Sequence, residues 1–260
     1  MPMSRPPREI ILADDEAQRE ITRRTRRGFL VAGLAAAGGF GIYEWVTRAQ
    51  DVDNAPWPQR KILDLNGRIS HAYLSNSHLM PEYPKSRVGP IKVNGDIGMT
   101  DSFDMRKWRL NVANGPEDAD PLLSLTMADI ATLPKVNMTT LFCCIEGWSV
   151  IQSWGGARFS DFTKKYFPPG QSLPQYAYMA TPGEDYYVGL DMKSALHPQT
   201  LLAYEHNGEP LEREHGAPLR LVIPVKYGIK NIKRIGLIRY TNDRPDDYWA
   251  DEGYDWFAGL

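Results

Sequence analysis

The chain has 260 residues, enough for one large domain with a tail and for a full hydrophobic core. Hydrophobic residues make up 42% and charged residues 24% of it, which are ordinary values for a globular protein. The formal net charge of −2 excludes a global positive field, so no nucleic-acid partner is expected. Twenty prolines and thirteen tyrosines indicate much irregular structure and argue against a helical bundle.

The two cysteines, Cys143 and Cys144, are adjacent in the sequence. A disulfide framework is therefore excluded. A bridge between neighbours is strained, because their Cα atoms lie closer than normal bridge geometry requires. At least one of these thiols is expected to do something other than crosslink the chain.

The N-terminal segment combines paired arginines with an apolar run. Arg26 and Arg27 precede Gly28-Phe29-Leu30, and weakly hydrophobic, Gly- and Ala-rich residues continue to Tyr43. This register favours a twin-arginine export signal over a short membrane anchor or a buried helix. The run is shorter than the about 20 residues of a comfortable membrane span, and no clean cleavage site follows, so cleavage and retention as an anchor both stay open. Either way, the body is expected on the periplasmic or extracytoplasmic face of the cytoplasmic membrane.

Short strands without a regular alternation with helices predict the fold class of the body. The segment 51–60 is polar and broken by proline, and is expected to be a linker. Strands are predicted at 108–112, 122–125, 136–144, 176–180, 201–204, 219–225 and 235–240, and helical segments from a capped start at 126–129, at 159–167 and at 191–196. Asn207-Gly208 signals a hairpin. The pattern predicts an α+β fold with a mixed sheet over 61–242.

The most informative segment delivers a thiol at the end of a strand. Leu141-Phe142-Cys143-Cys144-Ile145-Glu146-Gly147-Trp148-Ser149 reads as a β-rich run that reaches two cysteines and then a glycine break. Successive strand side chains point to opposite faces, so Cys143 and Cys144 are not expected to line the same pocket. A thiolate at an exposed strand end suits a soft or high-valent metal, although a cysteine on an apolar strand is more often a small core residue.

A second segment places cations after a buried strand. Residues 216–233 contain Arg220 on an apolar strand, followed by a glycine-containing turn with Lys226, Lys230 and Lys233. Backbone N–H groups and cations at close range suit a phosphate, whereas a solvated basic turn is the plainer interpretation.

These two segments resemble one known family. Cys144-Ile145-Glu146-Gly147-Trp148-Ser149 resembles the Cys-hydrophobic-Glu-small-Trp-Ser signature of bacterial sulfite-oxidase-family molybdoenzymes, in particular catalytic subunits of periplasmic methionine sulfoxide reductases. Residues 216–233 resemble the stretch of that family that holds the pterin and its phosphate. Weaker matches in the same chain order are 75–78, 176–181 and 196–202, and the resemblance covers roughly residues 60 to 242.

The resemblance implies a mononuclear molybdenum–molybdopterin cofactor and a set of site residues. Cys144 is the implied metal ligand and, with Glu146, a catalytic residue. The other implied cofactor-binding residues are Asn76, His78, Thr181, His215, Arg220, Asn231, Ile232 and Lys233. His215 departs from the family, whose members have Asn before Gly-Ala-Pro. Cys143 would face the core side.

Glu146 allows two interpretations. It is either a carboxylate paired with a nearby Arg or Lys, or a group on the same strand face as the thiol that tunes the metal or passes protons. The proton that must accompany oxygen-atom chemistry favours the second interpretation.

Residues 243–260 hold six acidic residues and five aromatic residues. This tail is expected to pack back over the domain rather than to be disordered; the alternative is a docking surface for an electron-transfer partner.

The function expected from the resemblance is two-electron oxygen-atom transfer by an exported oxidoreductase, a monomeric catalytic domain acting on a small-molecule substrate. Reduction of an S- or N-oxide is favoured over sulfite dehydrogenase activity, because sulfite oxidases carry a cationic sequence after the ligand cysteine and this chain has Glu146-Gly147-Trp148. No Cys-x-x-Cys-His haem motif occurs in the sequence, so a separate partner is expected, either a haem protein in the membrane or a soluble cytochrome. The alternative from another class is a non-catalytic membrane-tethered binding or assembly protein, against which the intact Cys144 speaks.

Overall fold

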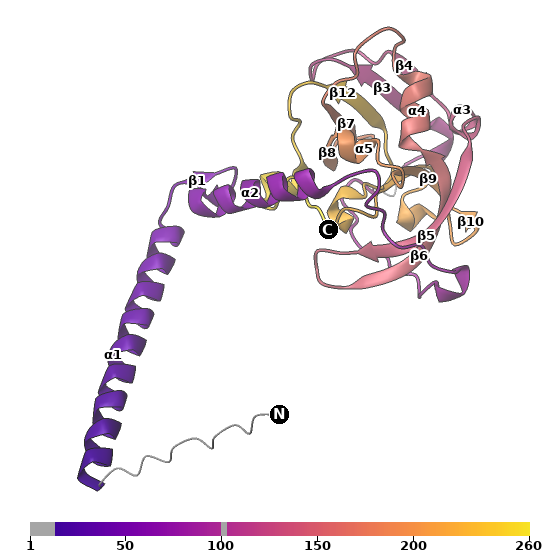
Figure 1. The fold of residues 1–260 in the computed structure, drawn as a ribbon. Coiled ribbons are helices and arrows are strands. Elements are labelled where there is room, and N and C mark those ends of the chain that lie inside the picture. Colours follow the sequence, from indigo (N-terminus) through magenta and orange to yellow (C-terminus); the bar gives the residue numbers. More distant parts are fainter. Residues whose placement is uncertain (1–13, 100–102) are drawn as a thin grey trace, which may run out of the picture. The chain divides into compact units, whose positions relative to one another are not determined.

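The computed structural model describes residues 14–99 and 103–260. The chain divides into two compact units, one containing the N-terminal helix and the other containing residues 59–260 together with 52–55. The helices are α1 (Asp14–Thr47), α2 (Trp57–Tyr73), α3 (Met127–Ala131), α4 (Phe159–Tyr166), α5 (Met192–Ala195) and α6 (Tyr248–Asp251). Figure 1 shows their order along the chain.

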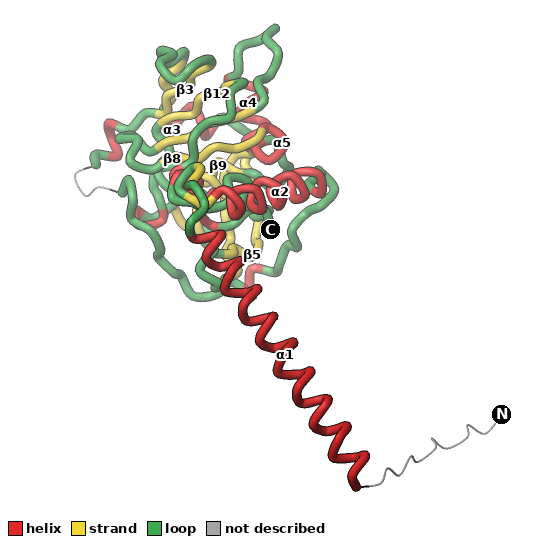
Figure 2. The backbone as a smooth tube through the Cα atoms, turned by 90° about the vertical axis from the view of Figure 1, so that its left-hand side faces the viewer, coloured by secondary structure: helices red, strands yellow, loops and turns green. Residues whose placement is uncertain are grey.

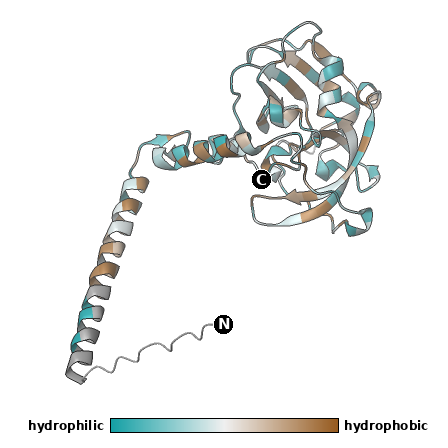
Figure 3. Cartoon of the chain, viewed as in Figure 1, coloured by the Kyte–Doolittle hydropathy of each residue, from teal (hydrophilic) through white to brown (hydrophobic). Residues whose placement is uncertain are grey.

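The N-terminal unit is dominated by the single long helix α1. Its segment Phe29–Thr47 is long and apolar enough to cross a membrane, and none of that segment is buried against protein. Hydrophobic residues gather along the C-terminal part of α1 (Figure 3). The arginine pair of the predicted export signal therefore lies in the same helix as the apolar segment. That segment extends to Thr47 rather than ending at Tyr43.

The second unit contains two five-stranded sheets. One has the order β10-β9-β6-β5 with β11 also pairing with β9, and the other has the order β4-β3-β12-β7-β8. The strand bounds are β3 (Leu110–Asn114), β4 (Leu123–Leu125), β5 (Lys135–Cys143), β6 (Ser149–Arg158), β7 (Tyr176–Ala180), β8 (Tyr187–Asp191), β9 (Leu201–His206), β10 (Glu209–Pro210), β11 (Arg220–Val222) and β12 (Leu237–Thr241), with the short β1 (Asp51–Val52) and β2 (Ala55–Pro56) earlier in the chain. Strand β12 runs parallel to β3 and antiparallel to β7, so the second sheet is mixed and the predicted α+β class is confirmed.

The larger of two hydrophobic core clusters joins the sheets and helices. Ile238 and Tyr240 of β12 are fully buried, as are Phe159 and Phe162 of α4. The Tyr240 hydroxyl lies 2.9 Å from Thr163 Oγ1, which gives this buried phenol a polar partner. Figure 2 shows long loops surrounding the strands, as the proline content indicated.

Most predicted elements lie within two residues of the observed ones. The hairpin at Asn207-Gly208 is confirmed, with positive φ at both residues, and so is the capped helix start at Thr126, whose side chain and that of Asp129 form a capping box. The predicted strand 219–225 is shorter than expected, because only Arg220–Val222 pairs with β9.

The sequence patterns did not predict β6, β8 or α2. Strand β6 contains Gly155-Gly156, which usually interrupts a strand pattern. Here the pair lies at a register shift against β9, and a Cβ at Gly156 would approach the Leu202 carbonyl oxygen to 2.2 Å. The glycine therefore permits the close backbone approach.

The acidic tail 243–260 packs back over the domain, as expected. Lys230 Nζ lies 2.5 Å from Asp247 Oδ2 and donates to the Gly189 carbonyl at 2.9 Å. Lys226 Nζ donates to the Phe257 carbonyl at 2.7 Å. Burial lowers the pKa of both lysines, while the carboxylates opposite them, Asp247 for Lys230 and Asp191 for Lys226, raise it.

Asp247→Ala should destabilise the second unit strongly. The change leaves the Lys230 ammonium buried without its carboxylate and removes the N-cap of α6. Breaking such a pair typically costs about 3–5 kcal/mol in free energy of unfolding. Thermal unfolding of the purified protein in detergent measures it, with the exposed neighbour in Asp246→Ala as control. Equal melting temperatures for the two variants would contradict the assigned role.

Candidate active site

The β5–β6 hairpin places the Cys144 thiol at a strand end. Strand β5 ends at Cys143 and β6 begins at Ser149. The Cys144 N–H donates to the Trp148 carbonyl at 2.9 Å, and the Gly147 N–H donates to the Cys144 carbonyl at 3.1 Å. Gly147 has φ +87°, a conformation that favours glycine. The five-residue loop so closed holds Cys144 at 8% exposure.

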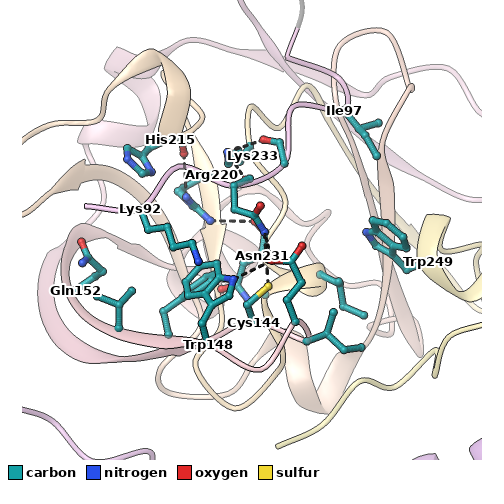
Figure 4. A pocket seen from close by; sticks show the side chains of 18 of the residues that line it. Lys92, Ile97, Cys144, Trp148, Gln152, His215, Arg220, Asn231, Lys233 and Trp249 are labelled. Atoms are coloured by element: carbon teal, nitrogen blue, oxygen red, sulfur yellow. Dashed lines mark hydrogen bonds between the residues drawn. The ribbon is translucent and has the colours of Figure 1, made fainter. Parts of the chain in front are cut away.

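Cys144 lines a pocket that Cys143 does not line. The pocket is bordered by the β5–β6 hairpin, the loop 92–97, the 3₁₀ turns near His215 and Gly228, and the C-terminal segment (Figure 4). Its lining residues are Lys92, Asn94, Gly95, Ile97, Phe142, Cys144, Ile145, Glu146, Trp148, Val150, Gln152, Trp154, Tyr186, His206, His215, Arg220, Gly228, Ile229, Asn231, Lys233, Trp249 and Tyr254. Cys143, at the end of β5, has intermediate exposure and is not among the residues that line the pocket.

Polar groups converge on the thiol. Asn94 Nδ2 donates to Cys144 Sγ at 3.6 Å and lies 3.4 Å from Glu146 Oε2. The Trp148 indole N–H donates to the same Glu146 oxygen at 2.9 Å. Glu146 and the thiol therefore share the Asn94 amide, and Glu146 lies in the turn after the strand rather than on a strand face. Among the described residues, the hydrogen-bond partners of its carboxylate are an amide and an indole rather than an Arg or Lys.

A buried guanidinium forms the opposite side of the pocket. Arg220 donates to the carbonyls of His215 (3.0 Å) and Asn231 (3.1 Å), and its guanidinium carbon lies 4.7 Å from the Trp154 ring centre. Burial lowers the pKa of Arg220 to about 10, so it remains protonated at neutral pH. Within the described part of the chain, no carboxylate pairs with it. The result is a buried positive charge that favours an anion.

Two buried polar atoms of the pocket lining have no hydrogen-bond partner among the described residues. They are Trp154 Nε1 and His215 Nε2, the latter 3.6 Å from Glu212 Oε2. Burial, and next Arg220, lower the pKa of His215 to about 4, so its ring is neutral at pH 7. Buried polar atoms usually have hydrogen-bond partners, so these two indicate a polar ligand.

His206, Glu212 and His215 carry potential ligand atoms within 4.8 Å of one another. This group is poorly suited to a cation, however. His206 Nε2 already lies 2.5 Å from Gln152 Oε1, and the nearby Arg220 charge helps to lower the pKa of both histidines. The same charge repels a metal ion.

Lys233 ties the edges of the pocket together. Its Nζ donates to the carbonyls of Asn94 (2.7 Å), Gly95 (2.8 Å) and Glu214 (2.8 Å). Burial, and next Arg220, lower the pKa of Lys233 to about 8. The sequence suggested a phosphate site from all three lysines of this turn; only Lys233 lines the pocket, because Lys226 and Lys230 bind the C-terminal segment.

The structure brings six of the ten predicted site residues together. These are Cys144, Glu146, His215, Arg220, Asn231 and Lys233. Asn231 also stabilises the turn between β11 and Lys233. Its side chain accepts a hydrogen bond from the Ile223 N–H at 2.8 Å and donates to the Tyr227 carbonyl at 3.1 Å.

Four predicted residues do not line this pocket. The Ile232 side chain is buried in the core, and its backbone carbonyl accepts a hydrogen bond from the Leu221 N–H. Thr181 is buried against Gly98, where an added Cβ would approach it to 2.6 Å. Asn76 and His78 are exposed, and His78 stacks on Tyr73.

Asn94, which the sequence interpretation missed, lies beside the thiol, whereas the sequence pointed to Asn76, in 75–78, as the asparagine that reaches the cofactor. Its segment has no periodicity, and Asn94-Gly95 reads only as a turn. Trp154, Trp249 and Tyr254 were also missed. They come from a strand that was not predicted and from the tail, which was expected only to pack.

The residues present fit a molybdopterin. A buried thiol offers a soft ligand at one end, and a buried guanidinium offers a site for an anionic tail. The His215 and Trp154 nitrogens, which have no hydrogen-bond partner among the described residues, offer contacts to a polar heterocycle.

The chain belongs to the family of molybdopterin-binding oxidoreductases, within the sulfite-oxidase superfamily. Residues 97–249 match the family described as "Oxidoreductase molybdopterin binding domain". The protein is thus an oxidoreductase with a molybdenum–molybdopterin cofactor.

Relatives lie among methionine sulfoxide reductases. One relative, from Azospira oryzae, is described as "Putative protein-methionine-sulfoxide reductase subunit YedZ1". It is 35% identical over 237 residues, which cover 90% of this chain and 86% of that protein. The protein-methionine-sulfoxide reductase catalytic subunit MsrP of Campylobacter jejuni is 31% identical over 186 residues, covering 63% of this chain and 60% of that protein. Among solved structures, the sulfane dehydrogenase SoxCD from Paracoccus pantotrophus matches with a TM-score of 0.47 and 20% identity, over 55% of this chain and 40% of that one.

The two cysteines should behave differently on substitution. Cys144→Ser should abolish activity and alter the spectrum of the molybdenum centre, because an alkoxide oxygen is a harder donor than a thiolate. Cys143→Ala should keep the metal signal at a cost of about 1 kcal/mol in stability. X-ray absorption and activity measurements on both variants test this. The reverse pattern would mean that the register of the hairpin is off by one residue.

Arg220→Ala should lose cofactor rather than merely slow turnover. A charge-assisted hydrogen bond to phosphate typically contributes ~1.5–3 kcal/mol, which corresponds to a roughly ten- to hundredfold weaker affinity. Pterin content per protein measures the effect. Arg106→Ala, at an exposed arginine that pairs with Asp104, is the control. Normal pterin content in Arg220→Ala would contradict the assignment.

Proposed function

We propose that this protein is an exported, membrane-attached enzyme that reduces an S-oxide, with methionine sulfoxide as the first candidate substrate. The observation that carries the proposal is the surroundings of the Cys144 thiol, where the Asn94 amide donates both to the thiol and to the Glu146 carboxylate. Lys92 lies beside this group, with its ammonium 4.1 Å from the centre of the Trp148 ring. A carboxylate there disfavours an anionic substrate such as sulfite and accepts a neutral S-oxide. The names of the Campylobacter jejuni and other MsrP relatives support the same choice.

The proposed roles follow the two sides of the pocket. Cys144 ligates molybdenum, and Arg220 with the Asn231–Lys233 corner and His215 holds the pterin and its phosphate. Thr181, Ile232, Asn76 and His78 stay as proposed cofactor contacts from the resemblance, with Asn94 as the better-placed asparagine. When bound, the cofactor supplies the two-electron oxygen-atom exchange.

The side chains of this protein manage the proton and the approach of the substrate. Reduction of an S-oxide by two electrons and two protons gives the sulfide and water, so a proton must be delivered beside the metal. Glu146 is the proposed carrier, held by the indole N–H of Trp148 and the amide of Asn94. Ile145, Trp148 and Trp249 give the pocket an apolar wall that suits the carbon substituents of an S-oxide.

The test is cofactor content followed by turnover. Protein made in a host that synthesises molybdopterin should contain one molybdenum per chain and oxidise a reduced viologen dye when methionine sulfoxide is added. Sulfite with a cytochrome acceptor is the comparison reaction. Turnover of sulfite alone would favour the dehydrogenase, and molybdenum-free folded protein would favour a non-catalytic binding or assembly role.

Glu146→Gln should keep molybdenum and lower turnover. Glutamine preserves size and hydrogen bonding but cannot carry the proton, and general acid–base catalysis contributes at least about a hundredfold. Trp148→Phe should lower turnover less, by about tenfold, because the carboxylate keeps its charge and loses one donor. Steady-state rates across pH measure both. A wild-type rate and pH profile for Glu146→Gln would leave Glu146 a structural residue.

The proposed location is the periplasmic or extracytoplasmic side of the membrane, reached by the twin-arginine route. Residues 1–50 would form the cytoplasmic tail and signal or anchor, 51–60 a linker, 61–242 the catalytic domain and 243–260 its acidic, aromatic tail. Helix α2 begins at Trp57, inside the proposed linker. A separate protein, either a haem protein in the membrane or a soluble cytochrome, would supply electrons to this catalytic chain.

Replacing both Arg26 and Arg27 with Lys should leave folded, cofactor-loaded protein in the cytoplasm. The twin-arginine pathway reads the arginine pair itself, and lysine keeps the charge but not the recognition. Fractionation of cells followed by blotting and molybdenum analysis measures the distribution. Replacing Arg23 and Arg24 with Lys is the control for a change of basic residues outside the register. Unchanged export of the Arg26/Arg27 variant would exclude this route.

A further inference from the structure

Helix α2 exposes a stripe of apolar side chains. Ile62, Leu65, Ile69 and Tyr73 are 66%, 50%, 60% and 67% exposed. Their spacing of three, four and four residues places them on one face of the helix. Scattered exposed apolar residues are ordinary, but a continuous stripe along about three turns of one helix marks an interaction surface.

The opposite face of α2 is packed, so the stripe is held rigidly by the domain. Arg60 is buried and donates to the carbonyls of Tyr254 (3.0 Å) and Ala250 (3.1 Å). The His71 ring packs edge-on against Phe257, with ring centres 5.7 Å apart. The stripe therefore belongs to a folded helix and not to a loose linker.

The residues beside the stripe indicate what covers it. Lys61 and Arg68 are exposed and lie four residues before and three residues after Leu65, so they border the stripe on one side. An apolar stripe with a basic border and an aromatic end residue is the pattern of a helix that lies in a lipid interface. The cations complement the phosphates of anionic headgroups.

The chain connection supports the same occupant. Residues 48–56 separate the apolar segment Phe29–Thr47 from the start of α2, and such a connection reaches at most roughly 35 Å. If Phe29–Thr47 spans the membrane, α2 cannot be far from its surface. We infer that α2 lies on the membrane, with Ile62, Leu65, Ile69 and Tyr73 among the lipid chains and Lys61 and Arg68 at anionic headgroups. This inference rests on the proposed membrane attachment and not on the proposed substrate.

Photo-crosslinking of the full chain tests this contact. A benzophenone amino acid replaces Leu65 in one variant and Leu173, a single leucine 39% exposed outside the stripe, in the matched control. Both variants are reconstituted into vesicles of phosphatidylethanolamine and phosphatidylglycerol, irradiated and analysed by mass spectrometry. Flotation with the vesicles reports on the anchor separately, and viologen-linked turnover reports that the domain is folded.

The expected result is a phospholipid adduct at position 65 in several-fold higher yield than at position 173. Charge reversal by Lys61→Glu and Arg68→Glu in the Leu65 variant should lower that yield severalfold. Equal yields at the two positions in floated, active protein would overturn the inference while leaving the anchor and the function intact. In native membranes, a protein adduct at position 65 without a lipid adduct would overturn it in favour of a membrane partner.

Discussion

The closure of the β5–β6 hairpin is the constraint on which the site depends. The Cys144 N–H bonds to the Trp148 carbonyl at 2.9 Å, and Gly147 adopts a left-handed conformation that lets the loop turn within five residues. These contacts end the strand at Cys143, so the next thiol enters the pocket and the side chain of Glu146 turns back toward it. A side chain at Gly147 would strain this turn and loosen the thiol and the carboxylate together.

Around this turn the pocket separates charge. Glu146 lies beside the thiol, whereas Arg220 lies on the far side, buried and bound to backbone carbonyls. Lys233 connects the loop that contains Asn94 and Gly95 to the turn that contains His215. Its ammonium group donates to the carbonyls of Asn94, Gly95 and Glu214. A cofactor with an electrophilic metal at one end and an anionic tail at the other would bind with the metal at the thiol and the tail at Arg220.

The C-terminal segment connects the pocket to α2. Trp249 and Tyr254 line the cavity, while the carbonyls of Ala250 and Tyr254 accept hydrogen bonds from the buried Arg60 of α2. Lys230 secures the same segment through Asp247. The C-terminal tail is therefore part of the pocket wall, and Arg60 binds that wall to α2.

Short contiguous motifs identified the class of the protein and the central residues of its site. Cys144, Glu146 and Arg220 were found because each lies in a short contiguous motif, and strands β3, β5, β7 and β12 were found because their apolar patterns are local. Strand β6 was missed because the close approach to β9 that needs Gly156 is a contact with a distant segment.

The tertiary structure alone decided which lysines face the pocket and which asparagine reaches the thiol. Lys226 and Lys230 share a turn with Lys233, yet they point toward a tail whose packing the sequence does not specify. Asn94 reaches Cys144 across 50 residues of chain, and Asn76 does not line the pocket although it stands in a motif-like position. Local patterns fix the residues of an element and its periodicity, but contacts between distant segments depend on how the whole chain packs.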